Sequence, residues 1–285
     1  MKKKDEGVAE PVCILYDNGS LRPDPTLHLR TLAELLQHNL GLPVVATSLL
    51  HSDGVDTNLL NGKPALLLES TIRAMLESGI REFVILPQFL GPSRAVMDFV
   101  PDILSDFKTI YPDASFFQAN CLFNSSDNSG LLLADVLRDR LMELVRNRTS
   151  LPKRVIMVDH GSPVFDVNRV RRVVAKQLGK CLLKSSFVVQ ECSMERRDGP
   201  EFDFNEPLLE NLLKEPEFSD GAIVVPLFFS KGRHAGPGGD IDSICKASTV
   251  HPLLLADPIG LHPKLVHLLL MRFHEALPGK IISTN

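Results

Sequence analysis

The sequence lacks the features that mark several large classes of protein. Its five cysteines are odd in number and widely spaced, and no two of them form a C-x-x-C pair. This spacing argues against a disulfide framework and against a structural zinc site, and it predicts a reducing compartment of the cytoplasmic or organelle-matrix type. The basic start, Met1 to Lys4, is followed by acidic residues and Pro11 instead of an apolar run, so we expect no export signal.

Charge, hydropathy and missing motifs exclude further classes. A net charge of −4 gives no basic field, so nucleic acid is not an expected partner. Polar residues and prolines interrupt the most apolar stretch, 253–270, so we expect no membrane span. No G-x-x-x-x-G-K-[ST] phosphate loop is present, so the sequence gives no sign of a nucleotide site of that type.

The chain contains one pattern twice. The run VCILYDNGS in the first half parallels VIMVDHGS in the second, which makes Asn18 equivalent to His160. Further on, FVILPQFL parallels AIVVPLFF, and Pro87 matches Pro226 at nearly the same offset. Two independent matches at nearly one offset indicate an internal duplication.

Each copy alternates strand and helix signals. A short apolar β-rich run is followed by a Gly-Ser turn and a helical pattern. In the first copy Asp24 and Pro25 predict the N-cap and first residue of this helix, and Gly41 predicts its end; in the second copy Gly179 predicts the end. Second strands, second helices and third strands with a Pro-x-Phe motif follow. The second strands are expected at 43–48 and 186–192, and the second helices at 64–78 and 207–214.

This alternation predicts an α/β fold with two similar lobes, each a parallel sheet flanked by helices. We place the first lobe at 1–150 and the second at 151–285, with the polar run 147–152 as the linker. A helix at 131–145 is expected to close the first lobe, and 252–276 has the matching role in the second.

Three side chains of the second copy follow the ends of its strands. His160 follows the first strand, Glu195 the second and His234 the third. Ligands of parallel sheets bind beyond these strand ends. Imidazole and carboxylate groups can hold a divalent metal ion and accept protons. Each residue alone has an ordinary structural explanation, but their convergence on one edge predicts a site. Glu191 is close enough in sequence to take the place of Glu195.

The second copy resembles a known family. The segments VDHGS, ME followed by PLLE, VVPLFFSKGRHA and ADPIGLHP are similar to those of the CbiX sirohydrochlorin chelatases, and the first copy resembles them more weakly. The resemblance implies a class II-type tetrapyrrole chelatase. It would insert cobalt or iron, with nickel as a further candidate, into sirohydrochlorin without ATP, in cobalamin or sirohaem biosynthesis. It assigns His160 and His234 to metal binding and proton acceptance, and Glu195 as their acidic partner.

Such a substrate carries many carboxylates, so cationic side chains should line the cleft. The candidates lie near the expected ligands or at the equivalent place in the first copy; they are Arg196, Arg197, Lys231 and Arg233 in the second copy, and Arg94 with Ser93 in the first.

The first copy departs from the pattern at the chemical positions. Asn18 replaces the first histidine, Ala95 falls where His234 stands, and His51 lies near the place of Glu195. Asparagine and alanine cannot act as base and metal ligand. We therefore expect a degenerate first lobe that forms the other wall of the cleft, and one active site per chain in a monomer or weak homodimer.

Other interpretations remain open at this point. A non-catalytic carrier of tetrapyrrole or metal could use the same fold. A serine hydrolase using Ser162 is disfavoured because the G-x-S-x-G elbow is missing. A periplasmic-type binding protein would share the two-lobe plan but would need an export signal.

Overall fold

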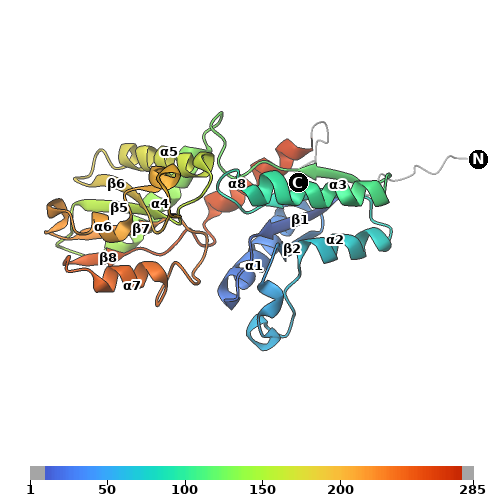
Figure 1. The fold of residues 1–285 in the computed structure, drawn as a ribbon, viewed down its shortest axis with the longest axis horizontal. Helices are drawn as coiled ribbons and strands as arrows, with labels where there is room; N and C mark the ends of the chain where they lie inside the picture. Colours follow the sequence, from blue (N-terminus) through green and yellow to red (C-terminus); the bar gives the residue numbers. More distant parts are fainter. Residues whose placement is uncertain (1–9, 278–285) are drawn as a thin grey trace, which may run out of the picture.

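A computed structural model describes residues 10–277; the basic start of the chain, on which the export-signal expectation rests, lies outside this range. Both lobes contain a four-stranded, wholly parallel sheet (Figure 1). In the first lobe the strand order is β2-β1-β3-β4, and in the second it is β6-β5-β7-β8. The predicted α/β fold with two similar lobes is confirmed. The strands are β1 (Val12–Asp17), β2 (Val44–Ser48), β3 (Glu82–Pro87), β4 (Ser115–Gln118), β5 (Arg154–Asp159), β6 (Val188–Ser193), β7 (Ala222–Pro226) and β8 (Leu253–Leu255).

Helices cover both faces of each sheet. They are α1 (Pro23–Leu40), α2 (Leu68–Glu77), α3 (Val100–Ile110), α4 (Ser129–Val145), α5 (Phe165–Cys181), α6 (Leu209–Leu212), α7 (Asp240–Ala247) and α8 (Pro263–Ala276). Short helical turns occupy several loops, namely η1 (Ser52–Gly54), η2 (Thr57–Leu60), the π-helical η3 (Ala95–Phe99), η4 (Pro200–Asn205) and η5 (Pro216–Phe218). No helix in the described range is long and apolar enough to cross a membrane.

Two predicted helix boundaries were wrong. Helix α1 begins at Pro23, after Arg22 as N-cap, so Asp24 lies in its first turn and makes no cap. Helix α5 continues through Gly179 to Cys181, because its buried face extends to Leu178 and packing outweighs the weak helix propensity of one glycine. Gly41, with a φ of 69°, does end α1 as expected.

The helices that close the two sequence halves are exchanged between the lobes. Helix α4, present where a helix was expected, packs against α5 and β7 of the second lobe (Figure 1). Helix α8 packs in turn against α1 and β3 of the first lobe. The expectation that each closing helix covers its own lobe was therefore wrong. Residue 150 separates the strands of the first sheet from those of the second along the chain. Its role as a domain boundary stays a prediction.

This exchange produces one continuous inner core. Alternate residues of the strands, such as Cys13 and Leu15 in β1 and Val155 and Met157 in β5, belong to a single buried cluster with α1, α4, α5 and α8. The opposite faces pack separately, the first sheet under α2 and α3 and the second under α6 and α7. A core shared in this way makes the two lobes one packing unit.

The loops at the carboxyl ends of the strands also meet across the lobes. Gly91, after β3, lies so close to α5 that a β-carbon would stand 2.8 Å from a methyl group of Val170. Gly232, after β7, approaches Pro25 at the start of α1, at 3.3 Å from a β-carbon position. These two contacts place the carboxyl ends of both sheets beside the same interlobe region.

Arg272 of α8 anchors the exchange. Its buried guanidinium donates to the carbonyl oxygen of Leu122 and ion-pairs with Asp127 and Glu275. We predict that Arg272→Met lowers the free energy of unfolding by about 2–3 kcal/mol, because the Leu122 carbonyl is left without its donors. Urea denaturation followed by circular dichroism measures this change.

The matched control is Arg73→Met, which removes an exposed pair with Glu69 and should cost less than about 1 kcal/mol. Equal losses in the two variants would contradict the anchoring role of Arg272.

Candidate functional site

The turn after β5 brings His160 and Glu195 together. The Asp159 carboxylate accepts hydrogen bonds from the Gly161 N–H, at 3.1 Å, and from the Ser193 hydroxyl of β6, at 2.6 Å. Gly161 has a φ of 89°, and a β-carbon there would stand 1.9 Å from the Glu195 carbonyl oxygen. The Glu195 N–H donates to the carbonyl of His160. Only glycine permits this approach, which sets the two side chains next to each other.

A buried arginine supports the turn from below. Arg171 of α5 is 1% exposed and ion-pairs with Glu191 of β6 at 2.6 Å. Its guanidinium also donates to the Ser193 hydroxyl and to the carbonyl of Asn205. Burial raises the pKa of Asp159, and the charge of Arg171 opposes that rise. Glu191, the alternative acidic partner, is thus occupied by Arg171.

The ring nitrogens of His160 have distinct partners. Nδ1 lies 3.1 Å from the Gly161 carbonyl oxygen and must donate to it, because a carbonyl only accepts. Nε2 then carries a lone pair and lies 3.5 Å from Oε1 of Glu195. Two acceptors face each other, and a proton or metal ion between them would satisfy both.

His234 presents a second lone pair beside the first. Its Nδ1 lies 2.7 Å from Oδ2 of Asp240, the first residue of α7, which directs the ring proton to the carboxylate. The two imidazoles meet edge to face with ring centroids 4.6 Å apart. Phe228 lies 6.4 Å from each of the rings and supports both. The structure thus places His160 beside Glu195 and beside His234, and the assignment of the three residues to one site stays a prediction.

The spacing of the first pair suits a metal ion. Two ligand atoms on a tetrahedral ion with bonds of ~2.1 Å stand about 3.4 Å apart, close to the 3.5 Å between His160 and Glu195. Among residues 10–277, no three His, Cys, Asp or Glu side chains stand together as a complete ligand set.

The first lobe has the same turn as the second but lacks the histidine and glutamate side chains that the turn carries there. Ser48 donates to Asp17 at 2.6 Å, and Gly19 has a φ of 90°, as in the second lobe. The carbonyl of Leu50 approaches Gly19 as that of Glu195 approaches Gly161, so Leu50 is the counterpart of Glu195, and His51 is the next residue along the chain. Leu29 stands at the position of Arg171, and burial without that cation raises the pKa of Asp17 to about 6.

The predicted cationic rim divides into paired and exposed groups. Arg196 is held by Asp203 and Glu206, and Lys231 is held by Asp257 at 2.8 Å. The remaining arginines are exposed and make no ion pair within the described range; they are Arg94, Arg197 and Arg233. The hydroxyl oxygen of Ser93 is buried and has no hydrogen-bond partner in that range.

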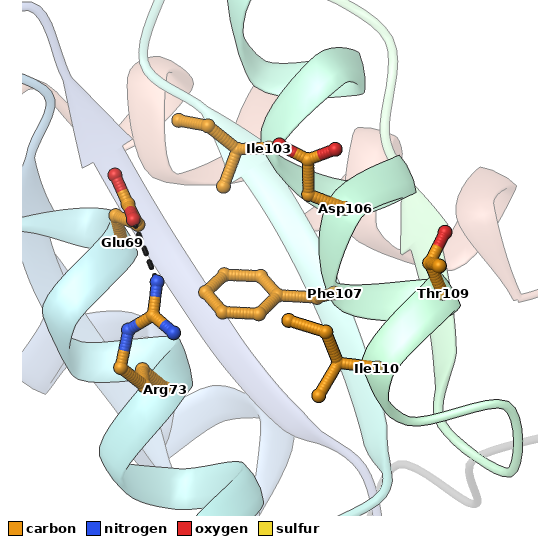
Figure 2. A pocket seen from close by; sticks show the side chains of 7 residues that line it. All are labelled: Glu69, Arg73, Ile103, Asp106, Phe107, Thr109 and Ile110. Carbon is orange, nitrogen blue, oxygen red and sulfur yellow. Dashed lines mark hydrogen bonds and ion pairs between the residues drawn. The ribbon is translucent and has the colours of Figure 1, made fainter.

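Two hollows lie apart from the histidines. One of about 610 Å³ lies between the lobes and is lined by residues of the first lobe together with Asp166 and Arg169 of α5. The other, of about 350 Å³, lies between α2 and α3 on the outer face of the first lobe (Figure 2). Figure 2 shows the Glu69–Arg73 ion pair beside the Phe107 ring, with none of the predicted site residues.

Sequence reasoning missed the supporting groups of the site. Asp240 stands six positions after His234 in a glycine-rich run that predicted only a turn, yet it starts a helix that points its carboxylate at the ring. Arg171 lies in the helical pattern of α5 with no local sign that it is buried.

Comparison with known proteins places the whole chain. The family model CbiX matches residues 12–144 and again 154–276. Among solved structures, SirB from Bacillus subtilis with Fe3+ aligns with a TM-score of 0.66 and 17% identity over 94% of this chain and 96% of that one. SirB from Bacillus subtilis subspecies spizizenii, a sirohydrochlorin chelatase in complex with cobalt, aligns with a TM-score of 0.64 and 15% identity over 94% and 95%.

A third structure, CbiX, the terminal enzyme for biosynthesis of siroheme in denitrifying bacteria, aligns with a TM-score of 0.59 and 16% identity over 94% of this chain and all of that one. No curated protein sequence matches this one. The structural likenesses show that the fold is that of these chelatases, and the double match of the family model shows that the chain belongs to the CbiX family, with one copy of the family's domain in each half.

Proposed function

We propose that this protein inserts a divalent metal ion into sirohydrochlorin or a closely related tetrapyrrole, without ATP, at the histidine pair of the second lobe. The observation that carries the proposal is the position of His160 at the carboxyl end of the second sheet, with its Nε2 atom 3.5 Å from the Glu195 carboxylate and its ring 4.6 Å from that of His234. Membership of the CbiX family and the fold of the solved sirohydrochlorin chelatases support it.

The reaction exchanges two pyrrole protons for one metal ion, which is a substrate here. His160, Glu195 and His234 are the groups that would receive the ion and take up the protons. Asp240 and the Gly161 carbonyl accept from the Nδ1 atoms, so both rings are oriented with Nε2 as the atom that would bind the ion or take up a proton. Exposed Arg197 and Arg233, and Arg94 of the first lobe, would bind peripheral carboxylates, with Ser93 as a further polar contact. Arg196 would act indirectly, through its ion pairs with Asp203 and Glu206.

Cobalt and iron are the first candidates for the ion, with nickel next. Nitrogen and oxygen ligands accept all three, and selection among them follows geometry and availability. One solved SirB structure contains Fe3+ and another is a complex with cobalt.

The direct test follows the absorbance of sirohydrochlorin under anaerobic conditions with Co²⁺, Fe²⁺ or Ni²⁺ and no ATP. We expect metal-dependent loss of the free-base spectrum faster than in a no-enzyme control. His160→Ala and His234→Ala should each lower the rate at least about 100-fold, because each removes a proton acceptor and ligand. Asn18→Ala, at the matched position of the first lobe, should retain most of it.

An equal loss of insertion rate in Asn18→Ala would contradict the placement of the active site in the second lobe. Tight tetrapyrrole binding without acceleration by any of the metals would instead identify a carrier.

The Asp240 carboxylate provides a second test. Asp240→Asn should lower the insertion rate about 10–100-fold, because the His234 ring loses the acceptor that sets its tautomer and orientation. Asp242→Asn is the matched control in the same helix, since Asp242 pairs with Lys246 and the Gly238 N–H. Its rate should stay within about twofold of wild type. A full rate in Asp240→Asn would show that His234 needs no such support.

A further inference from the structure

Three phenylalanines gather at the start of α5 and in η4. Phe165, in the first turn of α5, is 52% exposed, and its ring meets Phe204 edge to face with centroids 5.4 Å apart. Phe202 lies next to Phe204 with centroids 6.5 Å apart. Phe202 and Phe204 are half-buried members of η4. We call these three rings the aromatic shelf.

The shelf is held rigidly by polar contacts. The buried guanidinium of Arg171 donates to the carbonyls of Phe204, Asn205 and Glu206. Arg196 donates to the Gly199 carbonyl and pairs with residues on either side of Phe204. These contacts fix the backbone of η4, so the surface is formed before any ligand binds, which lowers the cost of binding.

The shelf is continuous with the histidine site. The Asn205 side chain accepts from the Ser162 N–H at 3.0 Å and donates to the Ser162 carbonyl at 2.9 Å. Ser162 lies two positions after His160, and Phe165 lies three positions further on. The loop that bears Glu195 at one end therefore bears Phe202 and Phe204 at the other, and both ends are tied to the turn that leads to Phe165.

The first lobe has no counterpart of the shelf. Its loop between β2 and α2, residues 49–67, contains no Phe, Tyr or Trp, and Pro23 stands at the position of Phe165. The aromatic shelf and the histidine pair thus occur together in one lobe and are both missing from the other.

Arginines surround the shelf. Arg172 lies 5.8 Å from the Phe165 ring centroid and donates to the Phe204 carbonyl. Arg169 and Arg172 follow Phe165 at helical spacing, so the three share one face of α5. Arg197 is exposed on the adjoining loop. A flat conjugated ring with anionic substituents is the ligand that this combination fits, because rings stack on rings and carboxylates pair with guanidinium groups.

We infer that the aromatic shelf is a stacking surface for the tetrapyrrole ring, with Phe165 as its principal contact. This inference rests on the proposed function, since it names how the same site would hold its organic substrate. The shelf binds the ring and takes no part in proton transfer or in binding the metal ion.

The test is titration of the protein with sirohydrochlorin in the absence of metal, followed by the absorbance shift of the ring. Phe165→Ala should weaken binding and raise the dissociation constant about tenfold. Phe165→Leu keeps an apolar side chain and should lose most of the same affinity, because stacking needs a ring. Phe204→Leu, a conservative change at a half-buried position, should weaken binding in the same direction.

Phe99→Ala is the matched control, since Phe99 is an exposed phenylalanine of the first lobe, at 44%, outside the shelf. It should bind sirohydrochlorin as wild type does. Co²⁺ affinity of the protein alone should be unchanged in Phe165→Ala, which separates the shelf from the metal ligands. Binding by Phe165→Ala within twofold of wild type would overturn the inference.

The two proposals fail in different ways. A wild-type protein that inserts metal while Phe165→Ala keeps its KM would refute the shelf alone. A wild-type protein that inserts no metal but binds the ring in a Phe165-dependent manner would refute the chelatase and support the shelf.

Discussion

The carbonyl oxygen of Glu195 occupies the space where a side chain on residue 161 would begin, and this close approach of two backbones sets the geometry of the site. It forces a glycine after His160 and aligns the ends of β5 and β6. The Asp159 carboxylate then fixes the turn by accepting from both strands. The same approach between Gly19 and Leu50 occurs in the first lobe. The turn is thus a property of the fold, and the chemistry depends on which side chains it carries.

The two lobes differ in the side chains that pack against this common turn. The second lobe has a buried cation, Arg171, where the first has Leu29. A buried guanidinium needs several acceptors, and it finds them in Glu191, in Ser193 and in the carbonyls of the η4 segment. Arginine in place of leucine at this helix position therefore accompanies the ordered η4 loop, the positioned Glu191 carboxylate and the aromatic shelf.

The duplication, the parallel sheets and the three chemical side chains could be predicted from sequence because each depends on local pattern. Apolar runs fix strands, and parallel strands bring their carboxyl ends to one edge, so His160, Glu195 and His234 had to be neighbours. The exchange of α4 and α8 could not be predicted, because an amphipathic helix shows which face is buried but not against which sheet. The pairing of Asp240 with His234 was missed for a similar reason, since it depends on the start of α7 within a glycine-rich run. Sequence comparison placed His51 near the counterpart of Glu195, and the approach of the Leu50 carbonyl to Gly19 identifies that counterpart as Leu50, one residue earlier.

The exchanged helices also limit how the molecule can move. Lys264 of α8 pairs with Asp135 and Asp139 of α4, and the inner core runs without interruption from one sheet to the other. Rotating one lobe away from the other would expose that core, so hinge opening of the kind seen when two domains are joined only by a linker is too costly. The gap between the sheets therefore has a fixed width. Any accommodation of the proposed substrate would therefore fall to the loops that follow the strands, such as the glycine-rich segment 235–239, while the shared core behind them keeps its shape.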